Sequence, residues 1–92
     1  MDISVTRTSG GDPLAFDVLI RDGRGESRHS VTLAQETLDR LASGHKAEDF
    51  VEAAFKFLLD REPKESILKR FDVTVIARYF PEFERELPQY LK

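Results

Sequence analysis

Histidine is the side chain best suited to proton transfer near neutral pH, and the chain contains two, His29 and His45. A catalytic base also needs a nucleophile or a substrate group within hydrogen-bond reach, and no motif around either histidine supplies one. We expect His29 to lie at the edge of the core, hydrogen-bonded to its neighbours. If it is buried in the neutral form, the protein should lose stability as the pH falls through its titration range.

A metal site is the second kind of chemistry that the residue types permit. His45 precedes Glu48, Asp49 and Glu52, and a helix extended back by one turn would place all four on one polar face. Carboxylates in a first helical turn also interact favourably with the helix dipole, which explains them without a ligand. We therefore expect no metal and no cofactor.

Covalent and phosphate chemistry lack their usual motifs. The chain has no cysteine and no serine in a G-x-S-x-G turn. The segment Gly23–Gly25 lacks the third glycine of a dinucleotide-binding fingerprint and is better explained as part of a hairpin turn. No acid, base and nucleophile that act together can be named, so the sequence favours a non-enzymatic protein with no catalytic residue.

The elements that position these residues begin with a β-hairpin. Alternating polar and apolar residues predict two strands, over about Ile3–Thr8 and Leu14–Ile20. The segment Asp22–Gly25 supplies a tight turn to a third strand. Closing the hairpin with Val18 across from His29, and Phe16 across from Val31, brings the apolar residues of both strands onto one face.

The stretch Glu48–Asp60 predicts the central core helix. At 100° per residue, its apolar side chains occupy one broad arc, which is typical of a helix covered on more than one flank. The residues of this arc are Phe50, Val51, Ala53, Ala54, Phe55, Phe57 and Leu58.

Shorter helices are predicted on either side. The capping-box spacing of Thr32 and Gln35 predicts a helix over about Leu33–Ala42. Pro63 starts another, which ends at Phe71 with Ile67, Leu68 and Phe71 facing inward, and Pro81 starts the last. Residues 73–80 have helical periodicity but a β-branched composition, so helix and strand both stay open.

The predicted fold is therefore α+β, with a three-stranded antiparallel meander over residues 3–33 followed by four or five helices packed on one face. Ninety-two residues suit a single domain over 1–92, with the meander in 1–33 and the helical part in 34–92.

Charge and hydropathy restrict the partners. The formal net charge is −3, and neither part of the chain has the concentrated positive charge typical of nucleic-acid binding. The start has no basic segment followed by an apolar run, and nowhere do eighteen apolar residues occur together. We expect a soluble cytoplasmic protein without a membrane partner.

Aromatic residues cluster late in the chain and predict an interaction surface. A small domain cannot easily bury all of them, and those left exposed would bind a protein partner or a second copy of the chain. Core packing explains the cluster equally well. The candidate contact residues are Tyr79, Phe83, Leu87 and Tyr90.

Nucleic-acid binding is the alternative function. Residues 64–80 would form two short helices joined by a tight turn, which partly matches a helix-turn-helix. The cations that would reach phosphates are Lys64, Lys69, Arg70 and Arg78. The intervening acidic residues and the net negative charge make this partner the weaker prediction.

The run Arg61–Glu84, REPKESILKRFDVTVIARYFPEFE, resembles a segment of a family of small uncharacterised bacterial proteins. The resemblance covers about a quarter of the chain. It implies a bacterial, cytosolic setting and transfers no activity, cofactor or site residue.

Overall fold

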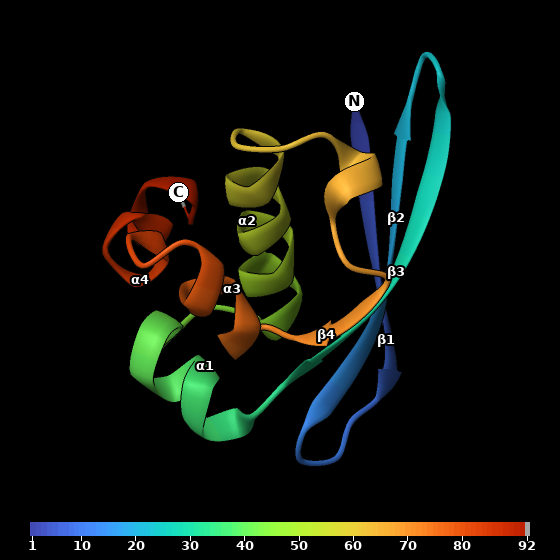
Figure 1. Cartoon of the computed structure of the whole chain (residues 1–92). Coiled ribbons are helices and arrows are strands. Elements are labelled where there is room, and N and C mark those ends of the chain that lie inside the picture. The colour runs from blue at the N-terminus through green and yellow to red at the C-terminus, as the bar shows by residue number, and fades with distance from the viewer. Residues whose placement is uncertain (92) are drawn as a thin grey trace.

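A four-stranded sheet with helices on one of its faces forms the structure, a computed structural model that describes residues 1–91 (Figure 1). The strands are β1 (Asp2–Ser9), β2 (Leu14–Asp22), β3 (Gly25–Leu33) and β4 (Arg70–Asp72). The helices are α1 (Gln35–Ala42), α2 (Ala47–Leu59), α3 (Thr74–Tyr79) and α4 (Phe83–Glu86), with 3-10 turns η1 (Lys64–Ser66) and η2 (Leu87–Tyr90). The α+β class predicted from the sequence is confirmed.

The β2–β3 hairpin has the predicted register. Val18 lies opposite His29, and Phe16 lies opposite Val31, so the apolar side chains of both strands face α2. Gly25 adopts a φ of 145°, a left-handed conformation that costs a glycine little. Turn chemistry and strand alternation specify the same register.

Strand β4 corrects the prediction of a three-stranded antiparallel meander. The segment expected to continue as a helix to Phe71 instead forms only the short turn η1 and then pairs in parallel with β3. The backbone N–H of Ser30 donates to the carbonyl of Lys69 at 2.8 Å, and the Thr32 hydroxyl donates to Asp72 at 2.6 Å. Pairing satisfies polar backbone groups along the β3 edge that a short helix would leave open.

Helix α2 is the centre of the core, as predicted. All seven residues of its predicted apolar arc are buried. The ring of Phe57 lies 5.0 Å from the ring of Phe83 and 5.9 Å from the rings of Phe80 and Tyr90, measured between centroids. These edge-on contacts attach the C-terminal segment to α2.

The start of one helix, α1, differs from the capping prediction. Thr32 belongs to β3, and α1 begins at Gln35, whose backbone N–H donates to the Asp12 carboxylate at 3.1 Å. Residues 74–79 are helical, so packing overrides the strand preference of their β-branched residues. The carboxylate of Asp72 accepts the backbone N–H of Thr74 at 3.0 Å at the start of this helix.

Candidate functional site

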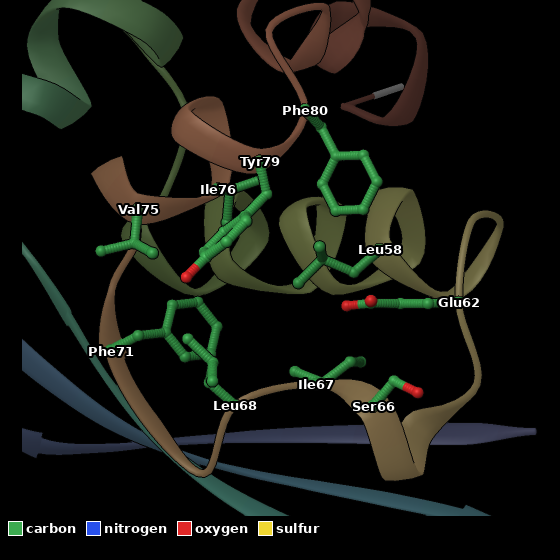
Figure 2. A pocket seen from close by; sticks show the side chains of 10 residues that line it. All are labelled: Leu58, Glu62, Ser66, Ile67, Leu68, Phe71, Val75, Ile76, Tyr79 and Phe80. Atoms are coloured by element: carbon green, nitrogen blue, oxygen red, sulfur yellow. The ribbon is translucent and has the colours of Figure 1, made fainter.

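A groove of about 390 Å³ opens between α2, the loop before β4 and α3 (Figure 2). Its lining is mostly apolar and comes from three segments that are separated along the chain. The lining residues are Leu58, Glu62, Ser66, Ile67, Leu68, Phe71, Val75, Ile76, Tyr79 and Phe80. The volume lies within the range of ordinary ligand and side-chain pockets, roughly 300–1,000 Å³.

Two exposed apolar side chains border this groove. Within residues 1–91, the large apolar residues that are exposed are Met1, Leu68 and Tyr79, with 72%, 48% and 69% of their surface accessible. Leu68 and Tyr79 both line the groove. Ile76, one turn earlier on α3, is buried, lines the same groove and packs the helix that carries Tyr79 against the core. An exposed leucine and an exposed tyrosine beside one apolar depression form a patch suited to binding.

Glu62 contributes a carboxylate to the groove, and Figure 2 shows its side chain pointing inward from the end that follows α2. Its backbone N–H donates to the carbonyl of Leu58 at 2.9 Å, and Pro63 then prevents further helix. The side chain is partly buried, and this burial raises the pKa of Glu62 above its ordinary value.

His29 connects the sheet to one side of the groove. Its Nδ1 lies 2.8 Å from the carbonyl oxygen of Leu68, and its Nε2 lies 2.9 Å from the hydroxyl of Ser27. Because a carbonyl can only accept, Nδ1 donates to Leu68 and Nε2 accepts from Ser27 in the neutral ring. The prediction that His29 is hydrogen-bonded to its neighbours is confirmed, and the structure shows in addition that its side chain is buried.

The Ser27 hydroxyl and the His29 ring are in hydrogen-bond contact, as a nucleophile and its base must be. Unlike a catalytic pair, however, they do not lie where a substrate could reach them. Both residues are buried, and neither lines the groove. Burial lowers the pKa of His29, which favours the neutral ring in the folded state. The pair therefore positions Leu68 and holds β3 against the loop before β4.

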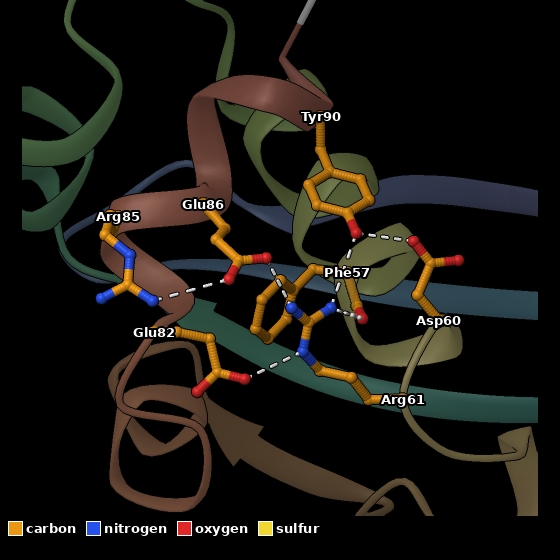
Figure 3. A network of polar contacts seen from close by, with 7 residues as sticks. All are labelled: Phe57, Asp60, Arg61, Glu82, Arg85, Glu86 and Tyr90. Atoms are coloured by element: carbon orange, nitrogen blue, oxygen red, sulfur yellow. Dashed lines mark hydrogen bonds and ion pairs between the residues drawn. The ribbon is translucent and has the colours of Figure 1, made fainter.

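The four residues of the predicted partner surface do not form one exposed patch. Tyr79 is exposed, but Phe83 and Leu87 have only 1% and 0% of their surface accessible, because they pack into the core beside α2. Tyr90 is partly buried, and its hydroxyl donates to the Asp60 carboxylate at 2.6 Å (Figure 3). Of this set, Tyr79 alone lies at the groove.

Arg61 organises the network that holds Tyr90 (Figure 3). Its guanidinium lies 3.7 Å from the centre of the Phe57 ring and donates to Glu82 at 3.1 Å and Glu86 at 2.6 Å. The same group donates to the backbone carbonyl of Phe57 at 3.2 Å. Because the bonds to Glu82 and Glu86 join the end of α2 to the C-terminal segment, the network fastens α4 and η2 to the core.

The cations of the predicted nucleic-acid surface are dispersed. Lys64 is buried and pairs with Asp22 at 3.0 Å and Glu65 at 2.6 Å. Lys69, Arg70 and Arg78 are exposed, but Arg70 alternates with the inward-facing Phe71 and therefore projects from the uncovered face of the sheet. Residues 64–79 form a turn, a strand and a helix in place of two consecutive helices.

Two of the residues considered as metal ligands in the sequence, Glu48 and Glu52, are engaged in ion pairs. Glu48 binds Arg7 through both carboxylate oxygens, at 2.9 and 3.0 Å, and Glu52 pairs with Lys56. Over the described range 1–91, no three His, Cys, Asp or Glu side chains are grouped in a way that could hold a metal ion.

Sequence reasoning missed two groove residues. Leu68 was expected to face inward from a helix, whereas the loop before β4 exposes it. Glu62 was not among the candidate site residues predicted from the sequence. The Glu62-Pro63 pair was the available signal, because it ends α2 and holds a carboxylate at the edge of the apolar core.

Comparisons with protein-family models, curated proteins and solved structures find no match to this chain. The resemblance of Arg61–Glu84 to a bacterial family stays a prediction. Within residues 1–91, no helix has both the length and the apolar character needed to cross a membrane.

Proposed function

We propose that this chain is a small non-enzymatic interaction module that binds a segment of another protein in the groove between α2 and α3. The observation that carries the proposal is the placement of Leu68 and Tyr79. These two exposed apolar side chains come from different segments and line the same depression. Their shared position favours a binding surface over the scattered exposure that is normal for single apolar residues.

The surroundings of the two side chains support this proposal. His29 holds the carbonyl of Leu68, and Phe71 packs against Phe55 with ring centroids 5.9 Å apart. A partner would therefore meet a surface whose backbone is already fixed. Preorganisation of this kind reduces the entropy lost on binding, and tyrosine is a common anchor residue at interfaces.

Selection of peptides from a random display library against the purified chain tests the proposal. Selected peptides should shift the amide NMR signals of Leu68, Val75 and Tyr79. Tyr79→Ser and Leu68→Ser should each weaken binding by about 10-fold or more, which is the size of a loss of about 1.4 kcal/mol.

The matched control is Arg24→Ser, at an exposed position in the β2–β3 turn. It should bind the selected peptides as the wild type does. Peptides whose signals map to another surface, or affinities that are unchanged in both groove variants, would contradict the proposal. Sedimentation of the free chain distinguishes binding of a foreign segment from self-association.

A further inference from the structure

The carboxylate of Glu62 is unusual among the acidic groups of this protein. Seven Asp and Glu side chains in residues 1–91 are partly buried, and six of them have a hydrogen-bond or ion-pair partner in that range. The six are Asp22, Glu48, Glu52, Asp72, Glu82 and Glu86. Glu62 is the seventh, and it has no such partner among the described residues.

An unpaired carboxylate beside apolar side chains carries a negative charge that no positive partner balances. Leu58, Ile67 and Phe80 line the same groove as Glu62, and their side chains offer its carboxylate no polar partner. Burial raises the pKa of Glu62, and within residues 1–91 no ion pair or side-chain hydrogen bond to its carboxylate offsets that effect. A positive charge brought into the groove would find a partner that has already lost part of its hydration.

The charged group and the aromatic rings of the groove lie toward opposite ends. Figure 2 shows the Glu62 carboxylate at one end, while the rings of Phe71 and Tyr79 lie toward the other. A bound segment would place an apolar side chain between these rings and Leu68. A lysine or arginine near that side chain would then reach Glu62.

We propose that the segment bound in the groove carries a large apolar anchor together with a nearby lysine or arginine, whose cation pairs with Glu62. This inference rests on the proposed function and names the chemistry of the partner. The chain itself has a net charge of −3, which also favours approach of a basic segment. An acidic residue at the same place would be rejected, because two carboxylates would share one poorly hydrated site.

Three matched series of synthetic peptides test the inference. Each peptide has one Phe or Leu in a Ser- and Ala-rich host, and the series differ in carrying Lys, Gln or Glu at each nearby position. Binding is followed through the amide NMR signals of Glu62, Leu68 and Tyr79. The best Lys peptide should bind about 10-fold more tightly than its Gln counterpart, the size expected for a charge-assisted contact.

Variants of Glu62 make the test specific. Glu62→Gln should reduce the preference for Lys over Gln to about 2-fold or less, since the remaining contact is neutral. Glu62→Lys should reverse the order, so that Glu peptides bind best. Asp39→Asn, which removes an exposed carboxylate on α1, should keep the wild-type preference.

Failure of this inference can be distinguished from failure of the proposed function. Equal binding of all three series, lost in Tyr79→Ser, would retain the groove as a binding site and overturn the role of Glu62. A dimer that Tyr79→Ser dissociates, with no peptide bound, would make a second copy the occupant and overturn the inference. A monomer that binds no peptide would overturn both.

Discussion

Protonation of the His29 ring is linked to the position of Leu68, which lines one side of the groove. Its Nδ1–H donates to Leu68, and burial lowers the pKa of His29 below the ordinary value of 6.5. As the pH falls below 6.5, the unfolded chain binds a proton at this position before the folded chain does. Stability that is fully present above the unfolded pKa is therefore lost as the pH falls toward the lower folded pKa.

Replacing this histidine should flatten the pH dependence of folding. His29→Gln removes the titrating ring and should cost about 1–2 kcal/mol near neutral pH, because buried hydrogen-bonding partners lose their geometry. Urea unfolding at a series of pH values between about 5 and 8 measures both effects. His45→Gln, at an exposed position, is the matched control and should follow the wild type. If the stability of His29→Gln and of the wild type changed with pH in parallel, the pH dependence could not be assigned to His29.

Helix α2 contributes three of the five phenylalanine side chains that are fully buried in residues 1–91, and its buried and exposed faces can be compared directly. Phe55 is buried between the rings of His29 and Phe71, at centroid distances of 5.5 and 5.9 Å. Phe55→Ala should lower the free energy of unfolding by about 3–5 kcal/mol, through lost burial and the cavity left behind.

The adjacent residue provides the control for that substitution. Lys56 is exposed and pairs with Glu52 at 3.2 Å. Lys56→Ala should change stability by about 0.5 kcal/mol or less. Denaturant unfolding measures both variants, and a similar loss in the two would show that α2 is not the centre of the core.

The stability of α4 depends on the guanidinium of Arg61 more than on the intrinsic stability of so short a helix. Helix α4 has only four residues, too few for a stable isolated helix. Arg61 holds it through Glu82 and Glu86 while lying over the Phe57 ring. A lysine keeps the charge but loses the planar fork that makes these contacts together.

Arg61→Lys should therefore loosen α4 locally. We expect a loss of about 1 kcal/mol in global stability and faster hydrogen exchange of the amides of residues 83–87, with β2 unchanged. Arg85→Lys is the matched control, because Arg85 is exposed and its nearest acid, Glu86, is 3.7 Å away. Equal exchange rates in the two variants would assign the stability of α4 to ring packing alone.

The hairpin and α2 could be predicted from the sequence because independent signals agreed. In the hairpin, the turn glycines and the alternation of strand residues both required Val18 opposite His29. In α2, the periodicity was long enough to identify the buried face, and the structure buries it. Local signals specify such elements without knowledge of the rest of the fold.

Strand β4 and the groove could not be predicted in this way. A strand of three residues carries no usable periodicity, and its partner β3 lies about forty positions earlier in the chain. Phe83 and Leu87, spaced at i and i+4, have the pattern of a core-facing helix, which was interpreted as a surface because their neighbours in space were unknown. Leu68 is exposed because the chain enters β4 just after it, so its exposure could not be predicted without predicting β4.

The chain leaves the sheet at Leu33 and returns to it at Arg70, so the parallel strand can join only after the intervening helices have been synthesised. Until then, a nascent polypeptide presents β3 to its surroundings with one row of amides and carbonyls unsatisfied. Such an open border recruits other chains into intermolecular ladders. A fragment truncated after Asp60 would keep that border permanently, and we expect it to precipitate where the intact protein does not.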